Sequence, residues 1–139
     1  MEITQEILDR LNDNPLYSSI GIRVLKAADG GAYSRLEPNQ DFCWPFPGQP
    51  HGGVLFTFMD TTMAWAVAGQ LEPGYNCTTI NMDIHYTASA KEGPFICTAR
   101  TTFRTGRMSF VRAEIQDARE KTLALGQGTF RIIRSDFIV

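Results

Sequence analysis

The sequence is poor in the features that define several common classes of protein. Its three cysteines, Cys43, Cys77 and Cys97, are odd in number and lack close paired spacing, which argues against a disulfide framework and a zinc site. The first residues include acidic Glu2 and Glu6, where a signal peptide would carry a basic region before an apolar stretch. We therefore expect a cytoplasmic protein without a metal site.

Neither charge nor hydropathy points to nucleic acid or a membrane as a partner. The formal net charge is -2 and the pI is about 5.6, so the chain has no general attraction to polyanions. The longest apolar run is interrupted by Asp60 and three threonines, which argues against a membrane span. With 139 residues, 43% of them hydrophobic and 20% charged, the chain is expected to form one globular domain, residues 1–139.

The N-terminal part of the chain carries a helical pattern followed by strand patterns. Apolar residues at helical spacing, with Thr4 as a cap, predict a short amphipathic helix over residues 4–12, which the stretch from Asn12 to Pro15 ends. Two alternating stretches on either side of Gly30-Gly31 then predict a β-hairpin. Its first strand contains Ile20, Ile22 and Val24, and its second covers residues 32–37.

Residues 38–50 contain four prolines and are not expected to form a regular element. Three aromatic residues, Phe42, Trp44 and Phe46, nevertheless make the segment too apolar for a free linker. We expect it to fold back over the rest of the protein. Trp44 and Phe46 could line a pocket there or simply pack on the core.

One long helix is predicted over residues 52–69, about 27 Å at 1.5 Å per residue. It is apolar almost all round, so we expect other structure to surround it. After Pro73-Gly74 the apolar pattern changes to a period of two. Strands are expected at residues 79–86, 94–103, 108–117 and 122–133.

In the first of these long strands, the alternation separates two faces. Strict alternation places Ile80, Met82, Ile84 and Tyr86 on one face and Thr79, Asn81, Asp83 and His85 on the other. Two short strands, one central helix and then a meander of long strands is the order of an α+β fold with an antiparallel sheet. A curved sheet wrapped around one apolar helix is the hotdog fold.

Asp60 is the one charged residue in the apolar stretch VLFTFMDTTMAWAVA, residues 54–68. No Lys or Arg on the same segment is available to pair with its carboxylate. Because a buried, unpaired carboxylate is costly, Asp60 is either exposed at an interface or retained for chemistry. A structural alternative is a carboxylate bonded to Thr79, Asn81 or backbone amides.

Two glycines, Gly52 and Gly53, open the predicted helix. Backbone N–H groups in a first helical turn lack intrahelical partners, and the helix dipole adds partial positive charge there. Without Cβ atoms, either glycine would let a carbonyl oxygen approach its amide and could stabilise the oxyanion formed in acyl transfer. Asp60 would then activate water or attack the acyl carbon itself.

The spacing of these residues limits how one site can contain them. Gly52 and Asp60 are eight positions apart on one helix, about 12 Å along its axis, too far for both to contact one carbonyl group. A second subunit must supply the other half. The spacing therefore predicts an active site at a dimer interface, with the Gly amide from one chain and Asp60 from the other.

The stretch GQPHGGVLFTFMDTTMAWA resembles a known family motif. It is similar to the His-Gly-Gly motif, followed seven residues after its second Gly by an acidic residue, of hotdog acyl-CoA thioesterases of the phenylacetic acid degradation (PaaI-like) type. The resemblance implies hydrolysis of an acyl-CoA or aryl-CoA thioester to the free acid and coenzyme A, with no cofactor beyond the coenzyme A of the substrate. It also implies a homodimer with shared sites, and pairing of dimers into a homotetramer.

Further residues gain candidate roles from this resemblance and from residue chemistry. His51 either caps the helix and holds the loop or contacts substrate. Thr79 matches a hydroxyl residue that helps to place water in related thioesterases. Arg104 and Arg107, on either side of Gly106, could hold the phosphates of coenzyme A, or they could be a solvated hairpin tip.

The sequence departs from the family pattern at one position. Related enzymes often carry Asn or Gln six positions before the motif histidine, where this chain has Pro45. Gln49, Asn39 or Gln40 could substitute. Two other functions also fit the pattern: a hotdog hydratase or dehydratase that uses His51 and Asp60 for proton transfer, and a non-catalytic acyl-CoA binding module.

Overall fold

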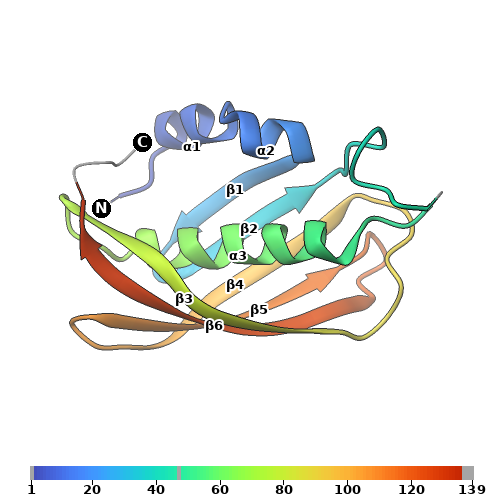
Figure 1. Cartoon of the computed structure of the whole chain (residues 1–139). Helices are drawn as coiled ribbons and strands as arrows, with labels where there is room; N and C mark the ends of the chain where they lie inside the picture. The colour runs from blue at the N-terminus through green and yellow to red at the C-terminus, as the bar shows by residue number, and fades with distance from the viewer. Residues whose placement is uncertain (1, 47, 136–139) are drawn as a thin grey trace.

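The computed structural model describes residues 2–46 and 48–135, which form a curved sheet around one long helix (Figure 1). Three helices and six strands make up this part of the chain. In order they are α1 (Gln5–Asn12), α2 (Pro15–Ile20), β1 (Ile22–Ala28), β2 (Gly31–Leu36), α3 (Gly52–Ala68), β3 (Tyr75–Tyr86), β4 (Phe95–Arg104), β5 (Met108–Gln116) and β6 (Thr122–Arg134).

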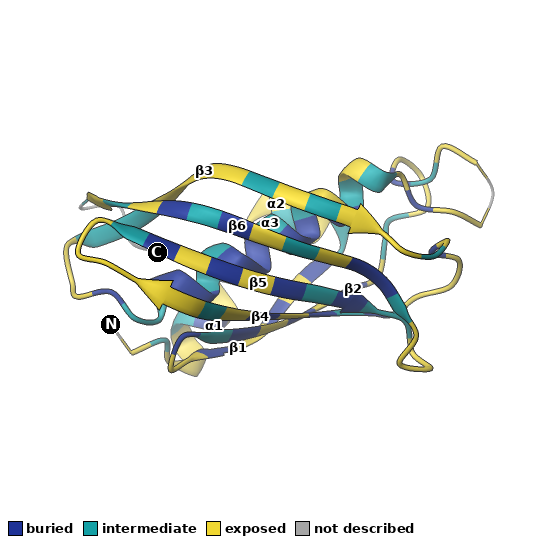
Figure 2. Cartoon of the chain, turned by 90° about the horizontal axis from the view of Figure 1, so that it is seen from below, coloured by how far each residue is buried: buried dark blue, intermediate teal, exposed yellow. Residues whose placement is uncertain are grey.

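The six strands pair in the order β1-β2-β4-β5-β6-β3, and every neighbouring pair is antiparallel. The concave face of this sheet wraps α3 (Figure 1). The side chains of Phe58, Met59 and Met63 on α3 are fully buried in the core. Figure 2 shows the outer face, where buried and exposed residues alternate along β5 and β6, as expected when one face of a sheet packs on a core. The predicted α+β hotdog fold is confirmed.

Glycines on β6 determine how closely α3 can approach the sheet. A Cβ atom at Gly126 would lie 2.3 Å from Met59 Sδ, and one at Gly128 would lie 3.0 Å from Met63 Sδ. The first distance is shorter than Cβ contacts allow and the second is tighter than most, so the two methionines occupy space that a larger residue would fill. The position of α3, and of every residue on it, therefore depends on these glycines.

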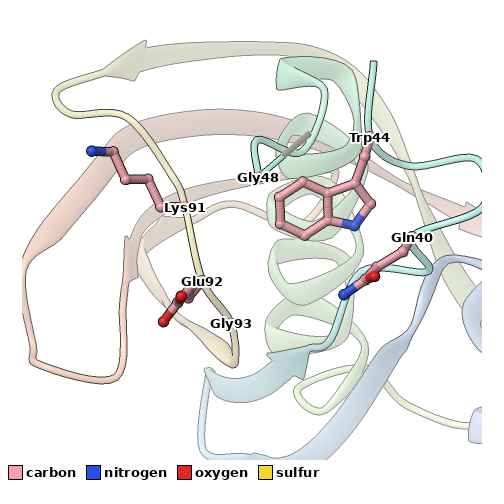
Figure 3. A pocket seen from close by; sticks show the side chains of 6 residues that line it. All are labelled: Gln40, Trp44, Gly48, Lys91, Glu92 and Gly93. Carbon is pink, nitrogen blue, oxygen red and sulfur yellow. The ribbon is translucent and has the colours of Figure 1, made fainter. Parts of the chain in front are cut away.

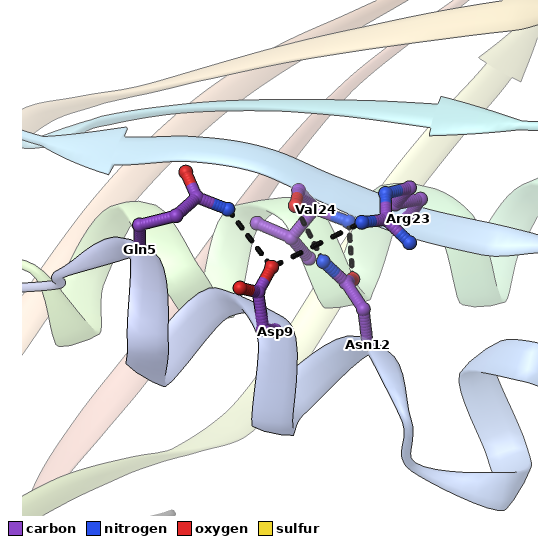
Figure 4. A network of polar contacts seen from close by, with 5 residues as sticks. All are labelled: Gln5, Asp9, Asn12, Arg23 and Val24. Atoms are coloured by element: carbon purple, nitrogen blue, oxygen red, sulfur yellow. Dashed lines mark hydrogen bonds and ion pairs between the residues drawn. The ribbon is translucent and has the colours of Figure 1, made fainter.

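The first helix confirms its prediction and covers the β1 edge of the sheet. Thr4 caps α1, and the helix ends at Asn12. The Asn12 side chain donates to Val24 O at 2.8 Å and accepts from Val24 N at 2.8 Å, so it pairs with β1 as a neighbouring strand would (Figure 4). Around it, Asp9 accepts a hydrogen bond from Gln5 and lies 4.0 Å from the Arg23 guanidinium.

A second short helix, α2, was not predicted, and it corrects the expected first strand. Asn14 caps α2 by accepting a hydrogen bond from Leu16 N, and Pro15 occupies the first helical turn. Ile20 therefore ends a helix, and the prediction that it begins the strand is wrong; β1 begins at Ile22. The expected hairpin itself is confirmed.

The hairpin turn lies one residue earlier than expected. Asp29 and Gly30 both have positive φ, 53° and 75°, and Ala28 pairs with Gly31 across the turn. A two-residue turn with two positive φ values matches the twist of the strands on either side. β2 accordingly begins at Gly31, inside the glycine pair that was expected to form the turn.

The long helix begins at the predicted residue and ends one residue earlier than predicted, at Ala68, but it is not enclosed on all sides. Gly53 and Phe56 are exposed, and Asp60 and Ala64, three to four residues further along, are half-buried. These four residues form one stripe along α3, which we call the open stripe. The expectation that other structure surrounds the whole helix is therefore wrong for this single chain.

Strand β3 forms the edge of the sheet beside the open stripe. None of its twelve residues is fully buried, and Ile80 is 52% exposed (Figure 2). An exposed edge strand with apolar side chains is a surface that can pair with another chain. β4, β5 and β6 lie within one residue of their predicted bounds.

The segment that leads into α3 is irregular, as predicted, but two of its three aromatic side chains are exposed to solvent and do not pack on the protein. Phe42 is 59% and Phe46 is 69% exposed, whereas Cys43 and Pro50 are buried. Cys43 N donates to Asn39 O, which closes a local turn. Buried Cys43, whose thiol donates to Ile20 O at 3.7 Å, and half-buried Trp44 therefore hold this segment against the protein, and Phe42 and Phe46 do not.

No helix within the described residues is long and apolar enough to cross a membrane.

Candidate active site

His51 sets the geometry of the turn that opens α3. Its backbone N–H donates to Cys43 O at 2.8 Å, and its side-chain Nδ1 accepts from Gly53 N at 2.8 Å. The imidazole is thus the N-terminal cap of α3, which is one of the two roles considered for it.

The backbone amides of this turn differ in whether they are already paired. Val54 N and Leu55 N donate to His51 O, at 2.9 and 3.4 Å, and Gly53 N donates to the imidazole. Among the described residues of the turn from His51 to Leu55, only the Gly52 N–H has no hydrogen-bond acceptor in the protein. Gly52 therefore offers a free donor at the helix N-terminus, and Gly53 does not.

Tyr86, at the end of β3, lies directly against Gly52. Its hydroxyl donates to Gly52 O at 2.6 Å, and a Cβ atom at Gly52 would lie 3.3 Å from Tyr86 Cζ. The alternating pattern in the sequence placed Tyr86 on one face of the predicted strand and indicated no role for it in the site. The contact joins residues 34 positions apart, so no local pattern could have indicated it.

Asp60 accepts a hydrogen bond from the Thr79 hydroxyl, with 2.8 Å between Thr79 Oγ1 and Asp60 Oδ1. Among the described residues, Asp60 has no ion-pair partner within 4.0 Å. Asp60 is half-buried, and one hydroxyl orients its carboxylate. No cation among the described residues neutralises its charge. Both the catalytic and the structural interpretations of Asp60 included Thr79 as a neighbour.

A β-bulge brings Thr79 to Asp60. Thr79 pairs with Phe130 and Asn81 pairs with Thr129, so Ile80 is an extra residue in β3. The bulge reverses the alternation of side chains at this point. The expectation that Thr79 shares a face with Asn81 is therefore wrong; its side chain reaches α3.

Two titratable neighbours of Asp60 are held neutral. Burial, together with the negative charge of Asp60, raises the pKa of Cys77 to about 12, and its thiol donates to Ala64 O at 3.5 Å. Burial also raises the pKa of Tyr17, whose hydroxyl oxygen accepts from Trp65 Nε1 at 3.0 Å. A protonated thiol is a poor nucleophile, so Cys77 does not compete with Asp60 for that role.

Trp44 lines a cavity of about 600 Å³ beside the segment that leads into α3 (Figure 3). Its indole Nε1 donates to Pro38 O at 3.4 Å, which fixes the ring. Phe46 does not belong to the described lining of this cavity and is exposed. The lining residues are Gln40, Trp44, Gly48, Lys91, Glu92 and Gly93.

The lining of this cavity includes one of the three side chains considered as a substitute for the Asn or Gln that related enzymes carry where this chain has Pro45. Asn39 Oδ1 accepts from Asp41 N in a local turn, so that side chain is already engaged. Gln40 and Gln49 are both exposed, but only Gln40 of the two lines this cavity with Trp44 (Figure 3). Of the three amides considered as substitutes, Gln40 is the one placed at a cavity.

Arg104 and Arg107 lie at the other end of the helix from Gly52. Arg104 Nη1 donates to Gln70 O at 2.7 Å, just beyond the C-terminus of α3. A helix of 17 residues is about 25 Å long, so the two arginines and Gly52 of one chain cannot contact the same small group. Arg107 is exposed at the β4–β5 turn.

Within the described residues, no group of three or more His, Cys, Asp or Glu side chains could hold a metal ion.

Solved structures of similar fold include thioesterases. The chain resembles a thioesterase of Haemophilus influenzae, with a TM-score of 0.87 and 19% sequence identity over 96% of this chain and 93% of the other. It also resembles the PaaI protein from the phenylacetic acid degradation operon of Escherichia coli, with a TM-score of 0.80 and 21% identity over 90% and 88% of the two chains. At these identities the likeness shows the fold alone.

Sequence comparison identifies the family. A Halobacterium salinarum protein that carries the name "Putative esterase" is 30% identical over 136 residues, which cover 91% of this chain and 89% of the relative. Residues 48–124, more than half of the chain, match the thioesterase superfamily. The match includes the turn at His51, the whole of α3 and the edge strand with Thr79. The chain belongs to the thioesterase superfamily.

Proposed function

We propose that the protein is a hydrolase that cleaves acyl-CoA or aryl-CoA thioesters in an active site shared by two copies of the chain. The observation that carries this proposal is the free Gly52 N–H at the N-terminus of α3, on the same helix as an Asp60 without an ion-pair partner. One group suits a developing oxyanion, and the other suits a general base or nucleophile.

In the proposed reaction, the carbonyl oxygen of the thioester accepts a hydrogen bond from Gly52 N–H. Asp60 of the second copy takes a proton from water as the water oxygen attacks the carbonyl carbon. The electron pair of the C=O bond moves to oxygen, where Gly52 N–H and the helix dipole stabilise the negative charge. The C–S bond then breaks, and coenzyme A thiolate receives the proton from Asp60.

A covalent variant of this reaction is equally compatible with the geometry. Asp60 could attack the carbonyl carbon itself and expel the thiolate, which leaves a mixed anhydride that water hydrolyses. In both variants the Thr79 hydroxyl holds one carboxylate oxygen, so the other is free to act. Both variants also give the same products.

The requirement for two copies follows from the rigid helix. The reacting carbonyl must contact Gly52 N–H directly and Asp60 either directly or through one water, whereas Gly52 and Asp60 are about 12 Å apart along α3. The edge strand β3 and the exposed Phe56 of the open stripe provide an apolar surface for a second copy. We propose a homodimer, which could pair again into a tetramer.

The substrate would extend from this site in both directions. The cavity lined by Trp44 lies next to the turn that presents Gly52, since Cys43 O accepts from His51 N. We propose that Trp44 contacts the acyl part of the substrate, with Phe46 at its exposed rim. Arg107, and the part of Arg104 not bound to Gln70, would contact the phosphates of coenzyme A from the end of α3 that carries the β4–β5 turn.

The test is release of thiol, followed with a chromogenic thiol reagent, from phenylacetyl-, benzoyl-, short-chain and medium-chain acyl-CoA. Wild type should turn over at least one of these esters, and Asp60→Asn should lower kcat by about 10²–10⁴-fold, the usual contribution of a general base. A wild-type protein that hydrolyses none of them, or an Asp60→Asn variant with the wild-type rate, would refute the proposal.

Oligomeric state gives a second and independent test. Sedimentation at micromolar concentration should show a dimer or a tetramer. A stable monomer with full activity would contradict the shared site, because one chain cannot bring Gly52 and Asp60 to the same carbonyl group.

A non-catalytic acyl-CoA binding module is the second candidate, and the Thr79–Asp60 hydrogen bond favours it. A carboxylate that is already bonded can be structural. Such a module would bind acyl-CoA without turnover, and its affinity would survive Asp60→Asn. The hydratase alternative has less support, since His51 Nδ1 is engaged by Gly53 N.

A further inference from the structure

The peptide group between Gly52 and Gly53 is held at both of its polar atoms. Its carbonyl oxygen accepts from the Tyr86 hydroxyl at 2.6 Å, and its N–H donates to His51 Nδ1 at 2.8 Å. These two partners come from different parts of the fold, one from the edge strand and one from the helix cap. The held peptide group directly follows the His51–Gly52 peptide, whose N–H is the free donor.

Consecutive glycines make this restraint necessary. Glycine has more backbone freedom than any other residue, and two in the first turn of a helix would leave the orientation of the Gly52 amide poorly defined. An oxyanion donor is effective only when it is already oriented, and a misplacement of about 1 Å can cost about 100-fold in rate. The turn therefore needs an anchor outside the helix.

Tyr86 has the placement of such an anchor. Its backbone pairs with Ala124 of β6, so the side chain projects from a hydrogen-bonded sheet. Its ring lies where a Cβ atom of Gly52 would be only 3.3 Å from Cζ, so glycine at this position allows the close approach. A tyrosine hydroxyl is protonated at neutral pH and able to donate, and partial burial raises the pKa of Tyr86 further from neutrality.

We propose that Tyr86 is a positioning residue of the oxyanion site: its hydroxyl holds the Gly52–Gly53 peptide so that the Gly52 N–H points at the thioester carbonyl oxygen. This inference rests on the proposed function. Tyr86 does not touch the reacting atoms; it acts through Gly52. The hydroxyl also joins the first turn of α3 to β3. The experiment must therefore distinguish the positioning role from a purely structural one.

Tyr86→Phe tests the hydroxyl and keeps the ring against Gly52. We expect kcat to fall about tenfold, as for the loss of one hydrogen bond of ordinary strength, with KM changed less than about twofold. The matched control is Tyr75→Phe on the same strand, whose ring lies 5.9 Å from the Arg134 guanidinium, and its kcat should be unchanged. Loss of thermal stability with an unchanged kcat would indicate a structural role and overturn the inference.

A second measurement does not depend on turnover. In ¹⁵N–¹H spectra, Tyr86→Phe should shift or broaden the Gly52 and Gly53 amide signals and speed hydrogen exchange at Gly53, whose N–H is bonded to His51 Nδ1, while Gly106 in the distant β4–β5 turn stays constant. Unchanged Gly52 signals would refute the role of Tyr86. A wild-type protein without thioesterase activity would refute the proposed function instead, and the spectra would still show whether Tyr86 orders the Gly52 amide.

Discussion

Thr79 on the edge strand donates a 2.8 Å hydrogen bond to Asp60, on the open stripe in the middle of α3. The pair exists because Ile80 is an extra residue in β3, which turns the Thr79 side chain toward α3. Without the bulge, strict alternation would place Thr79 on the outer face of the sheet. A local irregularity in strand pairing thus orients the one carboxylate on α3.

Removal of the Thr79 hydroxyl should impair catalysis more than folding. Thr79→Val keeps the shape of the side chain but leaves Asp60 without its donor, and we expect kcat to fall by about 10–150-fold, the value of one hydrogen bond to a charged group. Thr79→Ser keeps the hydroxyl and should remain within about threefold of wild type. Equal kcat values for wild type and Thr79→Val would show that this bond does not orient a catalytic group.

The cysteine beside Asp60 should be inert. Because burial raises the pKa of Cys77 to about 12, its thiol is protonated at neutral pH. Iodoacetamide at pH 7.5, about 4.5 pH units below that pKa, should therefore not inactivate the folded protein. Cys77→Ser should retain most of the activity. Rapid alkylation of Cys77 accompanied by loss of turnover would point to a thiol nucleophile instead.

The same shift predicts how stability depends on pH. The folded pKa of about 12 is above the ordinary value of 9.0, so the unfolded thiol loses its proton first as pH rises. The favourable contribution of the neutral Cys77 is complete below pH 9 and declines between about pH 9 and 12. The free energy of unfolding, measured with urea, should therefore decrease less steeply with pH across this range for Cys77→Ala than for wild type.

The sequence predicted the elements whose signals lie within one segment. The apolar run after Gly52 gave α3, and period-two patterns placed β4, β5 and β6 within one residue of their observed bounds. Spacing along α3 was also sufficient to separate Gly52 from Asp60, and it is the basis of the proposal that a second copy completes the site. These inferences depend only on regular geometry along the chain.

The features that sequence reasoning missed depend on contacts between distant segments. The six residues of α2 are too few for a periodic signal, and Asn14 and Pro15 were interpreted only as the end of α1. The bulge at Ile80 arises from pairing with β6, which β3 alone does not specify. Likewise, only the orientation of the His51 imidazole shows that Gly53 is paired while Gly52 is free.

Asn12 should be the most sensitive polar residue outside the site. Its side chain makes two 2.8 Å hydrogen bonds to the backbone of Val24, and Asn12→Ala leaves both buried backbone groups unpaired. We expect a loss of about 2–4 kcal/mol in the free energy of unfolding. In the matched control, Gln5→Ala removes an exposed bond to Asp9 and should cost less than about 0.5 kcal/mol. Urea denaturation measures both; equal small effects would contradict the role of Asn12.

The shared site can be tested by mixing two inactive variants. Gly52→Pro removes the free N–H, and proline suits the first position of a helix after a residue with φ of -59° and ψ of 138°, as at His51. Gly52→Ala, which presses on Tyr86 but keeps the N–H, is its control. We expect Gly52→Pro to lower kcat by about 10²–10³-fold and Gly52→Ala by less.

In a mixed dimer of Gly52→Pro and Asp60→Asn, one of the two shared sites contains both substitutions and the other contains neither. If the Gly52 amide and Asp60 come from different chains, mixing after mild unfolding and refolding should restore activity, up to about one quarter of wild type when chains pair at random. If both groups came from one chain, every site would carry one substitution and the mixture would stay inactive. The result therefore decides between a site shared across the interface and a site within each chain.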